Sequence, residues 1–254
     1  MLRIQEITIG SSQEALTIEK LKELTMLLPP LPEQTRIATV LSWFDDLIEN
    51  LKRQNELLEK TAMAIFKSWF IDFQPFKDGE FVYSEELDRE IPKGWEVKKL
   101  GNIVKFKSGG KAPQGEQYYV DETRGMPFIR VKHLAHGPVV VGCDFISKEA
   151  VKDYDLKLFQ EGSILIQKSG ESLKEARVNV LPFDALIVNH LFVFEFQKDY
   201  EFIRWFVFCF LKSSLGRIIT AQGGTTLPYL RSLDLNNVDV IIAPNIIFQR
   251  FHNL

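Results

Sequence analysis

The chain has 254 residues, of which 45% are hydrophobic and 26% are charged, and this composition is typical of a soluble globular protein. The formal net charge of −3 at pH 7 does not indicate a nucleic-acid-binding protein, but it does not exclude one, because the distribution of charge matters more than its sum. Two cysteines exclude a disulfide framework, residues 1–25 show no signal peptide, and the longest apolar stretch, 205–211, is too short to span a membrane, so we expect a cytoplasmic protein.

The N-terminal 28 residues are too few to form a domain of their own. Residues 4–9 indicate a strand, and residues 24–28 form a second apolar run. The segment Pro29-Pro30-Leu31-Pro32 then ends this run and pre-sets the first turn of a helix.

The dominant predicted element is a helix from about Glu33 to Asp72. Its apolar residues recur at alternating steps of three and four, which is the heptad pattern of helices that pair with other helices. One polar residue in this seam, Asn55, is a common device for fixing register or orientation. The alternative is a long amphipathic helix that lies on its own domain. We expect the helix-pairing seam to consist of Ile37, Leu41, Phe44, Ile48, Leu51, Asn55, Leu58, Ala62, Ile65 and Trp69.

After Asp72 the sequence changes to short strands and loops, with a buried amphipathic helix predicted from Tyr200 to Leu215. Many short strands with few helices predict an α+β domain from about Ile91 to Pro244. The expected fold class is therefore α+β, with one globular domain plus a long coiled-coil-type α-helix. Strands are expected at residues 127–132, 139–141, 159–167, 189–196 and 238–243.

Two segments about 215 residues apart share an order of features. The run from Gly10 to Gln34 and the run from Gly224 to Gln249 both contain small polar residues, then an apolar stretch that ends in a proline, then a glutamine. This repeat predicts that the chain starts on the closing segment of one domain, continues through the helix, and contains a second domain that ends in the same kind of segment. Chance similarity is the alternative.

We find no convincing catalytic or metal-binding set, and we expect no cofactor. The segment Gly109-Gly110-Lys111-Ala112 lacks the spacing and the Ser or Thr of a phosphate-binding loop. Glu96 and Lys98 match half of a nuclease motif, but such a triplet is common by chance. The four histidines show no metal-ligand spacing.

The stretch from Lys93 to Lys132 is positive although the whole chain is negative, because it holds nine basic and four acidic residues. Lysine and arginine supply salt-dependent attraction to phosphates, and polar side chains at loop tips read base edges. For each candidate, an ordinary solvent-exposed position is the alternative. The DNA-contact candidates are Lys107, Ser108, Lys111, Arg130, Lys132, His133, Lys168, Ser169, Gln222, Thr225, Thr226, Tyr229 and Arg231.

Three segments resemble the specificity subunit of type I restriction–modification systems. Residues 28–38, Leu-Pro-Pro-Leu-Pro-Glu-Gln-Thr-Arg-Ile-Ala, resemble the start of that family's conserved spacer helix. Residues 91–101 resemble the start of a target recognition domain, and residues 223–227 with 233–240 resemble its closing segment. The resemblance covers nearly the whole chain. It implies recognition domains that each read half of a split DNA site, and antiparallel helices that set the gap between the halves.

The resemblance also implies a division of the chain. Residues 1–28 would close a missing recognition domain, 29–75 would form the spacer and dimerisation helix, 76–244 the DNA-binding target recognition domain, and 245–254 the truncated start of a second spacer helix.

The implied function is non-catalytic DNA recognition, with methylation and cleavage in partner subunits. The implied partners are double-stranded DNA, the methyltransferase subunit, possibly the restriction subunit, and a second or complementary specificity chain. A coiled-coil adaptor without a DNA role, an inactive fragment of a rearranging locus and a nuclease that uses Glu96 and Lys98 remain as alternatives.

Overall fold

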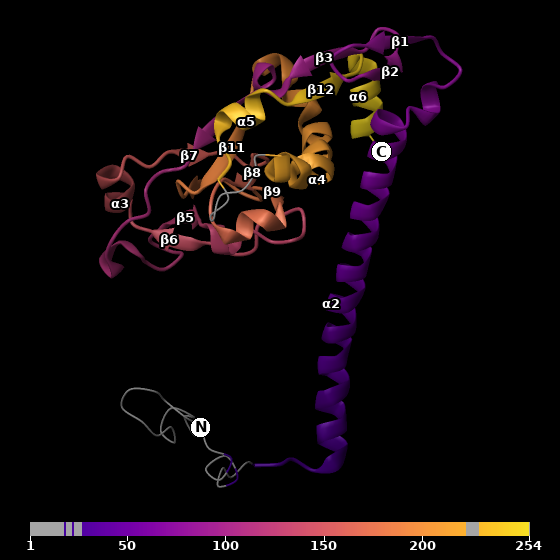
Figure 1. The fold of residues 1–254 in the computed structure, drawn as a ribbon. Coiled ribbons are helices and arrows are strands. Elements are labelled where there is room, and N and C mark those ends of the chain that lie inside the picture. Colours follow the sequence, from indigo (N-terminus) through magenta and orange to yellow (C-terminus); the bar gives the residue numbers. More distant parts are fainter. Residues whose placement is uncertain (1–17, 19–21, 23–26, 222–228, 254) are drawn as a thin grey trace. The chain divides into compact units, whose positions relative to one another are not determined.

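The computed structural model describes residues 18, 22, 27–221 and 229–253 of the chain (Figure 1). It divides into two compact units, Met1–Asn55 and Glu56–Leu254, which are described separately. The predicted fold class is confirmed, because a long helix is joined to a domain of small, mostly antiparallel sheets and short helices. In the described part, no helix is long and apolar enough to cross a membrane.

The strand predicted at 4–9 and residues 24–26 of the apolar run at 24–28 lie outside the described residues. The predicted division at residues 28, 75 and 244 stays a prediction.

The long predicted helix is α2, Leu31–Phe66, which continues as a π-helical turn, η2, over Lys67–Ile71. At its start the Gln34 side-chain amide donates to the Pro29 carbonyl oxygen over 2.7 Å. From Ile37 to Leu58 the apolar side chains of the predicted seam are exposed, with exposed fractions from 48% at Ile37 to 67% at Leu58. The last seam members, Ile65 and Trp69, are half-buried, and Trp69 packs against the larger core. A heptad seam that stays exposed in this way needs a second helix to bury it.

The last turns of α2 present a different face to the core of their own domain. Phe66 and Phe70 are only 1% and 2% exposed. The ring centroid of Phe70 lies 4.7 Å from that of Phe206 and 5.6 Å from that of Phe248. These contacts make the end of the helix part of the larger hydrophobic core, so the helix is anchored in the domain from Phe66 onward.

In a four-stranded sheet in the order β4-β11-β8-β9, the two central strands β11 and β8 are buried on both faces. Ile164 and Ile166 of β8 face the larger core with the helix α4, Arg204–Ala221, whereas Leu165 faces a second core. Burial on both faces explains the continuous apolar runs in these strands. The strand bounds are β4 Val104–Ser108, β8 Ile164–Gln167, β9 Val178–Val180 and β11 Leu191–Phe196.

The second core packs against another four-stranded sheet, in the order β6-β5-β10-β7. Its strands are β5 Met126–Ile129, β6 Asp144–Ile146, β7 Leu158–Phe159 and β10 Ala185–Ile187. Two two-stranded antiparallel sheets complete the domain, formed by β1 Phe81–Ser84 with β2 Arg89–Pro92 and by β3 Glu96–Lys99 with β12 Asp239–Ile242. The remaining α-helices are α3 Lys148–Asp153, α5 Ser232–Asn236 and α6 Asn245–His252.

Several predicted strands and the second predicted helix have different bounds in the structure. The strand expected at 139–141 is wrong, because only a single bridge from Val139 to Val180 forms there. The strand expected at 159–167 is two strands, separated by a turn in which Gly162 has φ +78°. The strand expected to reach residue 132 ends at Ile129, and the helix expected at 200–215 begins at Arg204.

We predict that Phe70→Ala lowers the free energy of unfolding by about 3–5 kcal/mol, because it leaves a cavity among aromatic rings. Urea unfolding followed by circular dichroism measures this change. The matched control is Phe183→Ala, since Phe183 is 36% exposed and should cost less than half as much. Equal losses for the two variants would contradict the anchoring role of Phe70.

Candidate nucleic-acid interface

Polar side chains from three segments lie close together at one edge of the β4-β11-β8-β9 sheet. The pairings of Phe192 with Ser108 and of Leu191 with Gln167 bring the end of β4, the end of β8 and the start of β11 together. We call the residues at this place the sheet-edge cluster, and they are Ser108, Lys168, Ser169, Asn189 and His190.

Hydrogen bonds tie the sheet-edge cluster together. The Lys168 ammonium donates to Ser108 Oγ over 2.9 Å, and Ser108 Oγ donates to the Asn189 carbonyl oxygen over 3.1 Å. Ser169 Oγ lies 3.0 Å from His190 Nδ1. The cluster therefore combines a cation, two hydroxyl groups and an imidazole within a small area, which is a set of groups suited to phosphate and base contacts.

Lys168 is the cation of this cluster, and it forms no ion pair with any residue in the described part of the chain. Burial lowers the pKa of its ammonium group. The nitrogen also lies 5.4 Å from the centroid of the Phe192 ring. A partly desolvated cation without a carboxylate partner gains by binding an external anion.

Residues 229 and 230, near the C-terminus, contact the sheet-edge cluster. The Leu230 amide donates to the Lys168 carbonyl oxygen over 2.7 Å, and Tyr229 forms a bridge with Ser169. Tyr229 is 53% exposed beside these residues. The candidates Gln222, Thr225 and Thr226 lie outside the described residues.

The two other candidates of the first loop differ in their relation to this cluster. The side chains of Lys107 and Ser108 point to opposite faces of β4, because successive residues of a strand alternate. Lys107 forms an ion pair of 3.6 Å with Glu195 on β11. Lys111 is exposed in the following loop. Its neighbour Gly110 accepts a hydrogen bond of 2.7 Å from the Asn189 amide, so the backbone at Lys111 lies next to the cluster, whereas Lys107 is held by Glu195.

A second group of candidates surrounds Asp144, and we call Arg130, Lys132, His133 and Asp144 the Asp144 cluster. Lys132 Nζ lies 2.6 Å and Arg130 Nη1 3.4 Å from the carboxylate oxygens. Burial alone would raise the pKa of Asp144, but the hydrogen bond and charge of Lys132 outweigh it and hold that pKa below its usual value. Two cations share one carboxylate, so the Asp144 cluster keeps an excess of positive charge.

His133 lies inside the Asp144 cluster, with an exposed fraction of 7%. Its Nδ1 accepts a hydrogen bond of 2.9 Å from the Arg130 amide, so the proton of the neutral ring is on Nε2. Burial lowers the pKa of His133, together with the charges of Lys132 and Arg130 and against the attraction of Asp144. This position favours a supporting role for His133 over contact with a ligand.

Arg231 is the last described candidate, and it is bound to its own helix. Its guanidinium lies 2.8 Å from Asp234 Oδ1 at the start of α5. The Arg231 hydrogen bond lowers the pKa of Asp234, and the same contact raises the pKa of Arg231. Arg231 is the N-cap residue of α5, so its side chain is already engaged in contacts with that helix.

The half nuclease motif has a structural explanation. Lys98 Nζ lies 3.0 Å from Glu96 Oε2 and donates to the Tyr200 hydroxyl over 2.9 Å. The hydrogen bond to Tyr200, and then the bond to Glu96, raise the pKa of Lys98. Within the described residues, no group of three or more His, Cys, Asp and Glu side chains could hold a metal ion.

The DNA-contact candidates predicted from the sequence did not include His190 and Asn189, because polar residues beside an apolar strand can equally be hydrogen-bonded inside the fold. The structure instead exposes His190 and half-buries Asn189 at the sheet edge. Their position directly before an apolar strand was the available signal, since strand ends carry polar groups to the surface.

We predict that the protein loses unfolding free energy between pH 7.5 and pH 5 partly through His133. Its folded-state pKa lies below the unfolded value of about 6.5, so the unfolded chain binds a proton that the folded chain excludes, and stability falls as the pH falls. His133→Asn keeps an acceptor for the Arg130 amide and should show a smaller loss over this range in urea titrations. His252→Asn controls for removing a surface imidazole, and equal slopes for wild type and His133→Asn would contradict the prediction.

Comparisons with known proteins agree with the early resemblance. The sequence matches the family described as the type I restriction modification DNA specificity domain over residues 1–60 and 92–247. The MjaIX type I restriction enzyme specificity subunit of Methanocaldococcus jannaschii is 53% identical over 251 residues, which cover 99% of this chain and 57% of that protein. The MjaVIII specificity subunit of the same organism is 26% identical over 226 residues, which cover 84% of this chain and 50% of that protein.

Solved structures share the fold. The type I restriction–modification S subunit from M. genitalium has a TM-score of 0.57 at 20% identity, with 98% of this chain and 59% of that chain covered. The HsdS subunit from Thermoanaerobacter tengcongensis has a TM-score of 0.51 at 18% identity, with 98% of this chain and 57% of that chain covered. The chain thus spans little more than half the length of the relatives it matches. On the family match and the 53% identity to a specificity subunit, this chain belongs to the type I restriction–modification DNA specificity family.

Proposed function

We propose that this chain recognises one half of a bipartite DNA site as a specificity component of a type I restriction–modification system. The observation that carries the proposal is the sheet-edge cluster, in which Lys168 lies beside two serines, a histidine and Tyr229. Family membership supplies the class of ligand, and the cluster supplies groups with suitable chemistry. The Asp144 cluster adds Arg130 and Lys132, which are 42% and 57% exposed.

The two clusters suit different parts of a DNA duplex. Arginine and lysine attract phosphates without regard to sequence, whereas hydroxyl, imidazole and phenol groups give directional hydrogen bonds to base edges. In this proposal, Arg130 and Lys132 hold the backbone, while Ser108, Ser169 and His190 are placed to read bases. Lys168 serves either purpose, because its amine is held by Ser108.

The chain itself is proposed to be non-catalytic, and methylation and cleavage are assigned to partner subunits. One solved structure that shares the fold is described as the structural basis of complex assembly and conformational transition of the type I restriction–modification system. We assign the docking of a methyltransferase subunit to the long helix α2, with a restriction subunit as a further candidate partner. Such a complex would act on the cell's own DNA in the cytoplasm.

The test of this function is a map of methylated adenines. The chain is co-expressed with its methyltransferase subunit in a methylation-free host, and long-read sequencing detects modified bases. We expect a bipartite motif that is absent without the chain, and we expect Lys168→Ala to lose or relax that motif. Lys77→Ala is the matched control, because Lys77 is exposed before β1, and neither it nor its neighbours in the sequence belong to either cluster. A soluble, expressed complex that produces no motif would contradict the proposal.

We also propose that two helices pair through the seam, from two copies of this chain or from this chain and a complementary one. The exposed apolar residues of α2 support this pairing. A symmetric pair of half-site readers would recognise a palindromic bipartite motif.

We predict that the purified chain is a dimer at micromolar concentration in light scattering. Leu58→Glu places a charge in the seam and should weaken dimerisation by at least about tenfold, or about 1.4 kcal/mol. The neighbouring Leu57→Glu is the control, because Leu57 is as exposed (64% against 67%) but lies outside the seam. A wild-type monomer, or equal effects of the two variants, would argue against pairing through this seam.

A further inference from the structure

The loop that follows η6 (Val131–His133) has no regular secondary structure, yet other parts of the domain hold its backbone. We call residues 134–138 the His136 loop. All six carbonyl oxygens from residue 133 to residue 138 accept a hydrogen bond. Backbone amides bind the first and the last of them, since Val141 donates to His133 and Val180 donates to Pro138, each over 2.8 Å. Side chains bind the four carbonyl groups between.

Two residues from the region of β9 supply three of these bonds. Asn179 is fully buried, and its side-chain nitrogen donates to the carbonyl oxygens of Ala135 over 3.1 Å and of Gly137 over 2.7 Å. Arg177 Nη1 donates to the Leu134 carbonyl oxygen over 3.0 Å. A buried carbonyl group without a partner costs free energy, so these bonds favour one path of the His136 loop over others.

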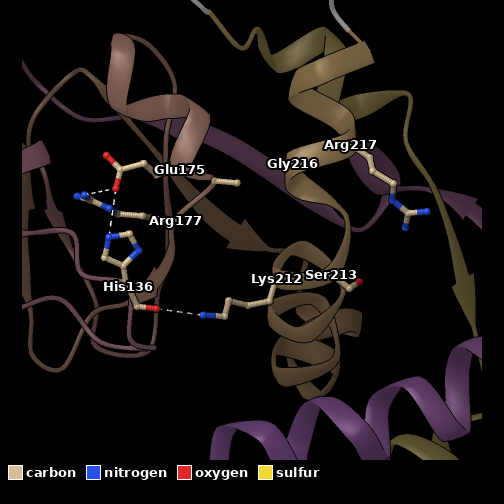
Figure 2. A pocket seen from close by; sticks show the side chains of 8 residues that line it. His136, Glu175, Arg177, Lys212, Ser213, Gly216 and Arg217 are labelled. Atoms are coloured by element: carbon tan, nitrogen blue, oxygen red, sulfur yellow. Dashed lines mark hydrogen bonds and ion pairs between the residues drawn. The ribbon is translucent and has the colours of Figure 1, made fainter. Parts of the chain in front are cut away.

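Lys212 of α4 supplies the fourth bond, and it also binds the long helix. Its Nζ donates to the His136 carbonyl oxygen over 3.3 Å and lies 2.6 Å from Glu59 Oε1 of α2. Figure 2 shows Lys212 extending from α4 toward His136. Only 18% of the Lys212 side chain and 27% of the Glu59 side chain are exposed, so solvent and salt screen this ion pair less than a pair on the open surface. One ammonium group therefore connects α2, α4 and the His136 loop.

The ion pair with Glu59 extends the attachment of α2 toward its pairing seam. Among the described residues, the apolar contacts of α2 with the larger core begin at Met63, and Phe66 lies 5.6 Å from Phe206 of α4 between ring centroids. Glu59 comes two turns before Phe66, which is about 10 Å along an α-helix. Two contacts separated along an axis restrain the angle between two helices, whereas contacts at one end act as a pivot. Glu59 also directly follows Leu58 of the seam.

The His136 loop continues directly from the Asp144 cluster. Leu134 follows His133 in the chain, and its amide donates to the Val131 carbonyl oxygen over 3.1 Å. Lys132 lies within η6, and Arg130 directly precedes it. The position of these two cations therefore depends on the position of the loop.

We propose that Lys212 is a positioning residue, which holds the His136 loop, and with it Arg130 and Lys132, at a fixed angle to the last turns of α2. The inference rests on the proposed function and adds what makes the gap between the two half-sites exact. Two recognition domains on paired helices read bases a constant distance apart only if each domain keeps its angle to its helix. Successive base pairs lie about 3.4 Å apart along the duplex, so a small change in this angle admits a gap one base pair longer or shorter.

The test maps methylated adenines for the chain in complex with its methyltransferase subunit and records the gap length of every modified site. The wild type should modify sites with one gap length. Lys212→Met removes the ammonium group and keeps an unbranched side chain, so the half-site bases should stay the same. The share of modified sites with a gap one base pair longer or shorter should rise at least about tenfold, because a partly buried ion pair is lost. A purely structural loss would instead reduce methylation at all sites without a new gap length.

Three further variants make the test specific. Lys212→Arg keeps a cation that can donate to both partners, and it should keep the wild-type gap. Arg217→Met removes an exposed cation of α4 that extends away from the His136 loop in Figure 2, and it should also keep the wild-type gap. Glu59→Gln removes the other charge of the pair and should relax the gap, with no further relaxation when it is combined with Lys212→Met. If the Lys212→Met complex does not assemble, Glu59→Gln decides alone.

Hydrogen exchange measures the loop directly in the same complexes. The Val141 amide, which binds the His133 carbonyl oxygen, should exchange about tenfold faster in Lys212→Met than in the wild type, because the loop opens more often. Arg217→Met should leave this rate unchanged. A relaxed gap without faster exchange would mean that the ion pair acts on the helix alone, and it would overturn the proposed link through the His136 loop.

The two proposals fail in different ways. A wild-type complex that is soluble but produces no bipartite motif overturns the proposed function. A wild-type complex that produces its motif, with Lys212→Met and Glu59→Gln showing the same single gap as Arg217→Met, overturns the positioning role of Lys212 and leaves the function standing.

Discussion

The fold of the recognition domain depends on the aromatic side chains with which the long helix ends. Phe70 contacts Trp95, Phe206 and Phe248, which come from three separate parts of the sequence. Burial of each such ring contributes about 1.5–3 kcal/mol, so these contacts tie an early segment to late ones. Phe66 and Phe70 are buried at the end of the helix, whereas the apolar seam residues from Ile37 to Leu58 stay exposed. One helix can therefore both anchor a domain and offer a pairing surface.

The functional surface depends on which cations lack a carboxylate. Arg231 is occupied by Asp234, and Lys107 lies beside Glu195. Lys168 of the sheet-edge cluster forms no ion pair with any described residue. An external polyanion gains most from such cations, since it need not displace an internal partner. The negative net charge of the chain hides this local pattern.

The differences between expected and observed elements have physical causes. Residues 139–141 are three valines, which favour strands, yet they lie where only one bridge to Val180 forms, because a strand needs a neighbour along its whole length. Gly162 breaks one predicted strand in two because its positive φ turns the chain. His133 was expected at the surface with Arg130 and Lys132, but the turn of η6 buries its ring against the Arg130 amide.

The sequence by itself determined the long helix, its heptad seam, the α+β class and the family, because these rest on periodicity and on local motifs that are read along the chain. Only the tertiary structure decided which polar residues act together. Ser108 and Lys168 are 60 positions apart, and Lys212 meets Glu59 from the far end of the chain. No local pattern encodes such pairs, since the register of the sheets and the docking of α4 create them.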